Sequence, residues 1–121
     1  RDELLVRQDA FAWPNTFRQA RMIPAVEYIQ ANRVRTMLMG RMEQALADVD
    51  VFVTPSYAGN VLLATNLTGH PCVVVPNGMI DGHPSSISFI GNLWQDGEAA
   101  RVAKAYQDAT GHHLGVPARF R

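Results

Sequence analysis

A short apolar run bracketed by prolines sets the tightest limit on the fold of this 121-residue chain. Residues 72–75 read Cys-Val-Val-Val, which predicts a strand buried on both faces. Pro71 and Pro76 limit this strand to about four or five residues, because proline cannot donate to a sheet ladder. Asn-Gly at 77–78 and Asp-Gly at 81–82 tolerate positive φ, so they predict a change of direction after the strand.

A second strand is predicted where residues 86–90 alternate serine with apolar side chains. In a strand, Ile87 and Phe89 would face one side and the serines the other. We therefore expect two antiparallel strands joined by a loop of roughly seven or eight residues. With the apolar run at 51–54, the runs at 72–76 and 86–91 are predicted to be neighbouring strands of one sheet.

Three helices are predicted around these strands. Pro24 suits a first helical turn, and the apolar positions that follow predict a long helix to about Ala47. Within it Gly40 lowers helix stability by about 1 kcal/mol relative to alanine, which suggests a close approach to a neighbouring element.

The other two helices are shorter. Residues 61–67 predict a helix that ends at Gly69 in a left-handed cap. Residues 98–110 predict a closing helix with Asp96 as N-cap and Gly111 as its stop. The fold class is therefore α/β, with about three strands, a long helix, a short helix and a closing helix.

The two ends of the chain lack such patterns. Residues 1–16 show no sustained period, and Trp-Pro-Asn at 13–15 is expected to break any helix, so an irregular lead-in is predicted. Residues 112–121 are predicted to be an irregular tail. The length of 121 residues allows one domain at most.

Bulk composition excludes several classes of partner. Eleven basic residues balance eleven acidic ones, so we expect neither a nucleic-acid nor a membrane partner. Cys72 is the lone cysteine, which favours a reducing, cytoplasmic location, and we predict it to be buried and unreactive. No signal peptide or membrane-spanning run is visible, and the absence of an initiator methionine at Arg1 suggests a piece of a longer protein.

An ordered set of motifs resembles the C-terminal signature of the amidase-signature hydrolases. These are Leu-Thr-Gly-His-Pro at 67–71, Val-Pro-Asn-Gly at 75–78, Gly-His-Pro at 82–84 and Phe-Ile-Gly at 89–91. Residues 49–55 resemble the preceding strand of that family, and residues 98–106 resemble its closing helix. The resemblance covers about Ala20 to Thr110 and implies that residues 1–121 form a partial amidase-signature domain, the C-terminal part of an α/β/α sandwich.

The resemblance implies cleavage of carboxamide C–N bonds through an acyl-serine intermediate, by a Ser–cis-Ser–Lys triad and a backbone oxyanion hole. The family carries these groups in a lysine-containing segment and a Gly/Ser-rich loop, and this chain has neither. Its one lysine, Lys104, is interpreted as a solvated helix residue, and Ser85-Ser86 as the opening of a strand. The family usually has glycine at the position of Ser86 and glutamine at the position of Ser88. No catalytic residue, metal site or cofactor is therefore assigned within these 121 residues.

Substrate binding is the contribution that this segment could make. The loop and short helix over 54–66 leave the C-terminal end of a strand, where α/β sheets place binding sites. We predict that Tyr57, Asn60 and Asn66 bind the amide substrate. Tyr57 would form an aromatic wall, and Asn60 and Asn66 would contribute their side-chain amides. Alternatively, the amides cap the short helix and Tyr57 packs on the sheet. The four histidines have no zinc-site spacing, and His70 and His83 are expected to be partly exposed turn residues.

Two other functions stay open. One, within the family, is a subunit that frees ammonia from glutamine for tRNA-linked transamidation. The other is a non-catalytic α/β interaction module. The expected partners are a small-molecule amide and the N-terminal remainder of the same fold, and an unpaired sheet edge makes a homo-oligomer of the isolated chain a further expectation.

Overall fold

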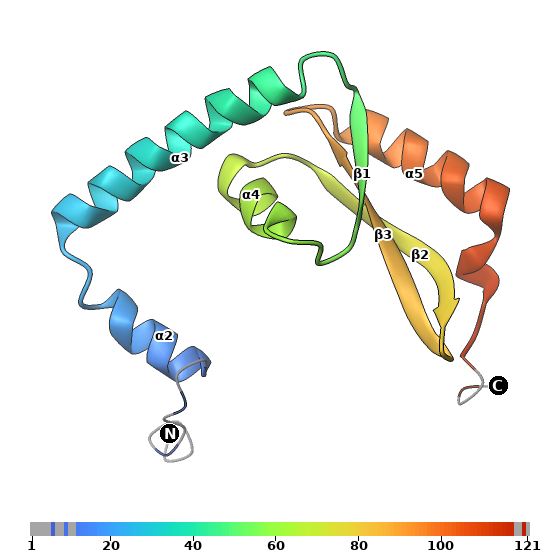
Figure 1. Ribbon diagram of the computed structural model, residues 1–121, viewed down its shortest axis with the longest axis horizontal. Helices are drawn as coiled ribbons and strands as arrows, with labels where there is room; N and C mark the ends of the chain where they lie inside the picture. The colour runs from blue at the N-terminus through green and yellow to red at the C-terminus, as the bar shows by residue number, and fades with distance from the viewer. Residues whose placement is uncertain (1–5, 7–8, 10–11, 118–119, 121) are drawn as a thin grey trace. The chain divides into compact units, whose positions relative to one another are not determined.

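The computed structural model describes residues 6, 9, 12–117 and 120, and it confirms an α/β fold (Figure 1). In chain order the elements are α2 (Trp13–Ala20), α3 (Ala25–Ala45), β1 (Val51–Pro55), α4 (Val61–Thr68), β2 (Cys72–Ile80), β3 (His83–Gly91), α5 (Asp96–Thr110) and a 3₁₀ turn (His112–Leu114). The chain divides into two units, Arg1–Val34 and Arg35–Arg121, and the second contains the whole sheet. Among the described residues, no helix combines the length and apolarity needed to span a membrane.

The three predicted strands form one antiparallel sheet of order β1-β3-β2, as the sequence indicated. The central strand β3 pairs on one side with β1, where Val53 lies opposite Phe89. On its other side it pairs with β2, where Val73 also lies opposite Phe89. The sheet therefore depends on β3 for all of its ladder hydrogen bonds.

The connection between β2 and β3 is much tighter than predicted. β2 continues through Pro76 to Ile80, and only the residues at 81–82 turn the chain into β3. Both turn residues have positive φ, as a two-residue hairpin turn requires. The register shifts between Pro76 and Met79, and this bulge accommodates the proline in an edge strand. The predicted strand limit and the predicted loop were therefore wrong.

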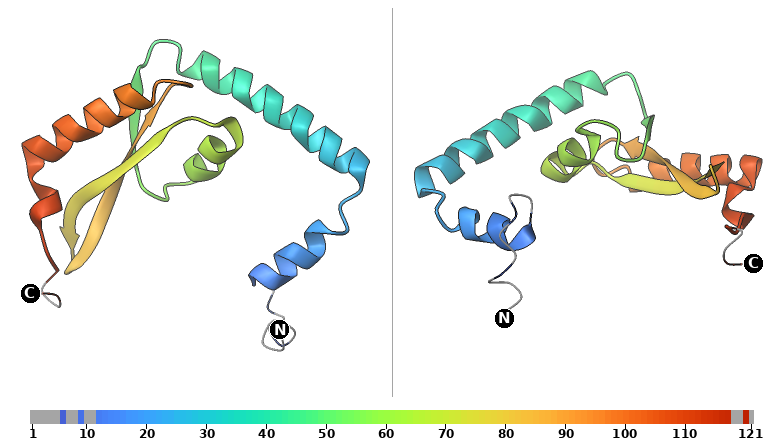
Figure 2. Two further views of the ribbon diagram at one scale, coloured as in Figure 1. Left: turned by 180° about the vertical axis from the view of Figure 1, so that it is seen from behind. Right: turned by 60° about the horizontal axis from the view of Figure 1, so that its bottom comes forward.

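Helix α5 covers one face of the sheet and builds the core (Figure 2). Val75, Phe89 and Ala103 are buried there, and Ile87 packs against them. This confirms that Ile87 and Phe89 share a face. Gly91 allows the close crossing, since a Cβ on it would lie 3.2 Å from the Cβ of Ala99.

The opposite face of β2 is not buried as predicted. Cys72 is exposed and Val74 keeps 55% of its surface accessible. Val75, which points to the side that α5 covers, is buried. The physical reason is that β2 is an edge strand with α5 on one side only. The prediction that Cys72 is buried was therefore wrong, whereas its low reactivity stays a prediction.

The long, short and closing helices lie close to where they were predicted, whereas α2 begins inside the predicted irregular lead-in. Trp13 and Pro14 begin α2 instead of breaking it, because a proline in the first turn has no hydrogen bond to lose. Asp96 lies in the first turn of α5, and Gln95 precedes it without a side-chain cap. A Cβ on Gly40 would meet no atom within 4 Å, so the expected close approach does not occur among the described residues.

Two glycines provide a stability test. Gly69 ends α4 at φ 84°, and Gly78 lies in the β2 bulge at φ 88°, with the ring of His112 3.4 Å from where a Cβ would be. We expect Gly69→Val and Gly78→Val each to lower the free energy of unfolding by at least about 1 kcal/mol, because a β-branched residue is strained at positive φ.

Urea titration would measure these changes. Gly40→Ala is the matched control, because Gly40 is helical and open around its Cα, so this change should raise stability by up to about 1 kcal/mol. An unfolding midpoint equal to that of the unsubstituted chain in either valine variant would contradict the assignment.

Candidate functional site

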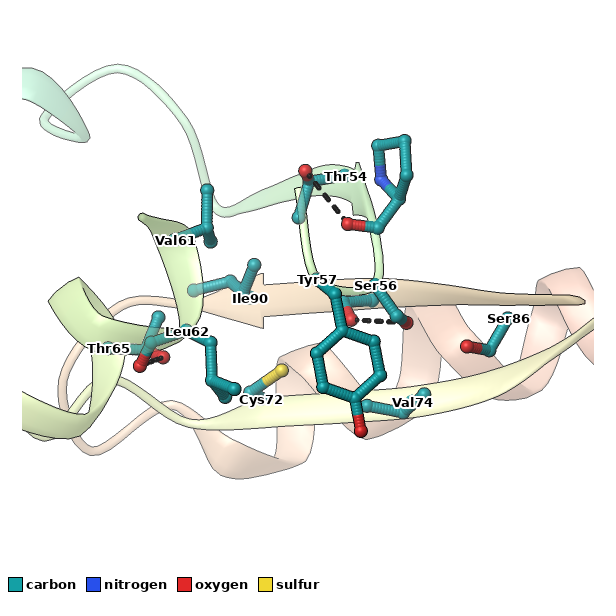
Figure 3. A pocket seen from close by; sticks show the side chains of 12 residues that line it. Thr54, Ser56, Tyr57, Val61, Leu62, Thr65, Cys72, Val74, Ser86 and Ile90 are labelled. Atoms are coloured by element: carbon teal, nitrogen blue, oxygen red, sulfur yellow. Dashed lines mark hydrogen bonds between the residues drawn. The ribbon is translucent and has the colours of Figure 1, made fainter. Parts of the chain in front are cut away.

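A pocket of about 160 Å³ opens on the face of the sheet opposite α5 (Figure 3). It lies where β1 ends, between α4 and the uncovered side of β2 and β3. Its lining comprises Thr54, Pro55, Ser56 and Tyr57 from β1 and the following loop, Val61, Leu62 and Thr65 from α4, Cys72 and Val74 from β2, and Ser86, Ser88 and Ile90 from β3.

The alternation of β3 supplies the polar part of this pocket. Ser86 and Ser88 face away from the core that holds Phe89, as the sequence predicted. The hydroxyls of Ser56 and Ser88 lie 2.9 Å apart and form a hydrogen bond that joins the loop after β1 to the middle of β3. The backbone N–H of Ser56 also donates to the carbonyl of Ser86 at 3.4 Å. These two bonds hold the loop against the sheet.

Hydroxyl protons in the pocket are only partly used by the protein. In the Ser56–Ser88 pair one hydroxyl donates to the other, so the proton of the acceptor remains available to a ligand. The side chain of Ser86 has no hydrogen-bond partner within the described part of the chain. By contrast, the hydroxyl of Thr65 donates to the carbonyl of Leu62 at 3.1 Å. The pocket therefore offers hydroxyl donors from β3 and the loop.

The remaining walls are largely apolar. In the view of Figure 3 the sulfur of Cys72 lies between the side chains of Leu62 and Tyr57. Tyr57 has φ 65°, which residues other than glycine rarely adopt, and its side chain is exposed at the mouth of the pocket.

The structure brings one of the three predicted substrate-binding residues to this pocket. Tyr57 lines it, and its 87% exposure excludes the alternative that it packs on the sheet. Asn60 precedes α4 without a side-chain cap bond, and Asn66 is an exposed residue of α4 outside the lining. The binding roles of all three stay predictions. Sequence reasoning missed Ser56 and Ser88, although the serine alternation of β3 was the available signal.

A second hollow lies around His70, whose expected partial exposure was wrong. It is lined by Glu43, Leu46 and Ala47 near the end of α3 together with His70, Asn92, Leu93 and Trp94. His70 is 5% exposed, and its Nδ1 lies 2.7 Å from the hydroxyl of Thr68. That hydroxyl donates to the carbonyl of Ala64, so Nδ1 carries the proton and donates, while Nε2 keeps its lone pair. Burial lowers the pKa of His70.

Within the part of the chain that the structure describes, the other titratable groups do not assemble into a reactive site. Lys104 pairs with Asp108 at 2.5 Å on the exposed side of α5, which confirms the interpretation of a solvated helix lysine. Within the described residues no cluster of histidine, cysteine and carboxylate side chains could hold a metal ion.

The lowered pKa of His70 predicts a pH dependence of stability. In the unfolded state His70 has a pKa of 6.5, and in the folded state its pKa is lower. As the pH falls through 6.5, the unfolded state therefore binds more protons than the folded state. We expect the free energy of unfolding to be full well above pH 6.5 and to fall as the pH drops through 6.5 toward the lowered pKa of His70 in the folded state. His70→Asn keeps an N–H donor for Thr68 but does not titrate, so this part of the pH dependence should vanish. Equal slopes in the two proteins, measured by urea titration at each pH, would exclude His70 as the cause.

Similarity to known proteins gives the family of the chain. No family model matches the sequence. The chain is 33% identical over 110 residues to the A subunit of glutamyl-tRNA(Gln) amidotransferase from Symbiobacterium thermophilum, and the match covers 75% of this chain and 22% of that protein. It is 32% identical over 109 residues to the corresponding protein of Bacillus velezensis and 31% identical over 109 residues to that of Desulforudis audaxviator, each match covering 74% of this chain and 22% of the relative.

The chain therefore spans about a fifth of the length of the curated relatives that it matches. These amidotransferase subunits are amidase-signature enzymes. The α/β elements observed here agree with a C-terminal part of that fold. On this similarity and on its ordered motifs, the chain belongs to the amidase-signature family and corresponds to a C-terminal portion of it.

Proposed function

We propose that this segment is part of an enzyme that cleaves the C–N bond of a carboxamide through an acyl-serine intermediate, which water then hydrolyses. Within that enzyme the segment supplies one wall of the substrate pocket, and the rest of the polypeptide supplies the nucleophile and the lysine base. The observation that carries the proposal is the hydroxyl-lined pocket beside the end of β1.

The chemistry of the pocket suits a carboxamide. The carbonyl oxygen of an amide accepts hydrogen bonds and its nitrogen donates them, and a serine hydroxyl can meet either group. Ser56, Ser86 and Ser88 provide such hydroxyls on one side of the pocket. Leu62 and Val74 provide apolar surface for the remainder of the substrate. A few polar groups set among apolar walls are the usual composition of a small-molecule site.

The described residues supply no base for these hydroxyls. A serine is a weak nucleophile until an adjacent base removes its proton. The pocket lining contains no lysine, histidine, aspartate or glutamate. Lys104 belongs to α5, which covers the opposite face of the sheet, and its ammonium is held by Asp108. The pocket serines are therefore proposed to bind the amide and not to attack it.

A second candidate is the A subunit of an amidotransferase, which would free ammonia from glutamine for tRNA-linked transamidation. The observation in its favour is that the relatives from all three organisms named above are glutamyl-tRNA(Gln) amidotransferase A subunits. Both candidates share the same bond cleavage. They differ in the amide that enters the pocket and in the acceptor of the nitrogen.

Ammonia release tests the proposal. We expect the 121-residue chain alone to release no ammonia from acetamide, benzamide or glutamine, because it lacks the base. The complete polypeptide that carries this segment should release it, and Ser88→Ala in that polypeptide should lower kcat/KM by roughly two- to tenfold through one lost hydrogen bond. Lys104→Ala is the matched control and should leave turnover unchanged. Turnover by the short chain would refute this account, and an inactive complete polypeptide would favour the interaction module.

We also infer that the uncovered surface of the sheet meets the remainder of the polypeptide. Neither β1 nor β2 has a second neighbour in the described sheet, and Val74, on the face that α5 leaves uncovered, is 55% exposed. Unpaired strand edges beside apolar side chains are templates for association. The isolated chain should therefore self-associate, which light scattering over a concentration series would detect. A monomer at every concentration would contradict this inference.

A further inference from the structure

We propose that the hollow around His70 receives the guanidinium group of an arginine side chain that the remainder of the polypeptide supplies. The hollow has a volume of about 460 Å³ and shares no lining residue with the pocket beside β1. The inference concerns a contact between parts of the polypeptide, so it goes beyond the proposed hydrolysis and does not depend on which amide is cleaved.

The segments that build the hollow are held together by the chain itself. Leu46 and Ala47 follow Glu43 by three and four residues, a spacing that places side chains on one side of a helix. The side chain of Asn92 donates to the carbonyl of Val49 at 2.8 Å, which fastens the segment after β3 to the segment after α3. All of the lining residues belong to the second of the two units, so the hollow forms within a single unit.

The polar groups of the lining accept hydrogen bonds and have no cation to pair with. Since Nδ1 of His70 donates to Thr68, Nε2 offers a lone pair that has no partner within the described part of the chain. Asn92 uses its Nδ2 on Val49, which leaves Oδ1 as an acceptor. The carboxylate of Glu43 has no ion pair among the described residues, and the lining contains neither lysine nor arginine. A matching group must therefore donate several hydrogen bonds and carry positive charge.

Arginine fits this lining better than lysine does. Its guanidinium has five N–H donors in a fixed plane and no acceptor, whereas an ammonium has three donors. The plane also stacks on an aromatic ring, and Trp94 offers one that is 94% exposed. Leu46, Ala47 and Leu93 supply apolar surface for the methylene stem. Burial lowers the pKa of His70, so its ring is neutral near pH 7 and does not repel the cation.

The remainder of the polypeptide is the proposed source of this arginine. About four-fifths of the length of each relative has no counterpart in these 121 residues, because each match covers 22% of the relative. In the proposed enzyme that remainder packs against this segment. An arginine held between Glu43 and Trp94 would be one fixed point of that contact. A free guanidinium compound is the competing source of the same chemistry.

Trp94 reports binding directly once Trp13 is replaced. The chain has two tryptophans, so Trp13→Phe leaves Trp94 as the one source of tryptophan fluorescence. N-acetyl-L-arginine amide and N-acetyl-L-citrulline amide share a stem, and only the arginine compound is charged. We expect the arginine compound to change the fluorescence saturably, and the citrulline compound to need at least about fivefold higher concentration. Working with dilute chain limits the self-association expected above.

Carboxylate variants in this Trp13→Phe background locate the site. Glu43→Gln removes the charge and should raise the Kd of the arginine compound about two- to fivefold, the effect of one exposed ion pair. Glu27→Gln is the matched control, because Glu27 is exposed on the same helix and lies outside the lining. His70→Asn keeps a donor for Thr68 and removes the Nε2 acceptor, so it should also weaken binding. Circular dichroism verifies that the variants fold.

Hydroxyl-radical footprinting identifies the source of the arginine. Peptide mass mapping measures the rate of oxidation at Trp94, both in the 121-residue chain and in the complete polypeptide. We expect severalfold slower oxidation in the complete polypeptide, because its own arginine covers the ring. Adding the arginine compound should protect Trp94 in the short chain and give no further protection in the complete polypeptide.

Three results would overturn the inference. These are equal effects of the arginine and citrulline compounds, equal affinities of Glu43→Gln and Glu27→Gln, and equal oxidation of Trp94 in the short chain and the complete polypeptide. Protection by the arginine compound in both proteins would assign the hollow to a free ligand and would overturn the proposed source. Because none of these readouts is turnover, their failure is distinct from failure of the proposed hydrolysis.

Discussion

The alternation of side chains along β3 governs both the packing of the sheet and the lining of the pocket. β3 is the only strand of the described sheet with two neighbours, so its register fixes the position of both other strands. One set of its side chains, including Phe89, builds the core under α5, and the other set, including Ser88, lines the pocket. A shift of one residue would exchange the two sets, burying serines without partners and exposing the core. The packing of the sheet and the lining of the pocket are thus specified by the same short pattern.

Close packing of α5 holds this arrangement from one side. Ala99 and Ala103 are almost completely buried, and their small side chains let the helix approach β3 at Gly91. Tyr106 extends the contact, since its ring lies 5.4 Å from that of Phe89 and its hydroxyl donates to the side chain of Asn77 in the β2 bulge. The far end of the hairpin is therefore fastened to the closing helix. With one face of the sheet covered by α5, the pocket opens on the other face.

The two faces of the sheet also differ in charge. The ion pairs described for the chain lie on the exposed surface of α5, where each contributes little to stability because water screens it. The pocket side carries hydroxyls and apolar groups instead. Among the residues that the structure describes, His70, close to the end of α4, is the buried titratable group, and its bond to Thr68 fixes its tautomer.

Local elements could be read from the amino-acid pattern alone, whereas the covering of each surface depends on how those elements pack. Turn residues, caps and periodicity located the strands, the long helix, the left-handed cap at Gly69 and the end of the closing helix at Gly111, because these depend on neighbours a few residues apart. The ordered motifs also indicated the family. The exposure of Cys72 could not be read in the same way, because an apolar run looks alike in a central strand and in an edge strand with one free face. The Ser56–Ser88 contact, which joins residues 32 positions apart, exists only once β1 has paired with β3.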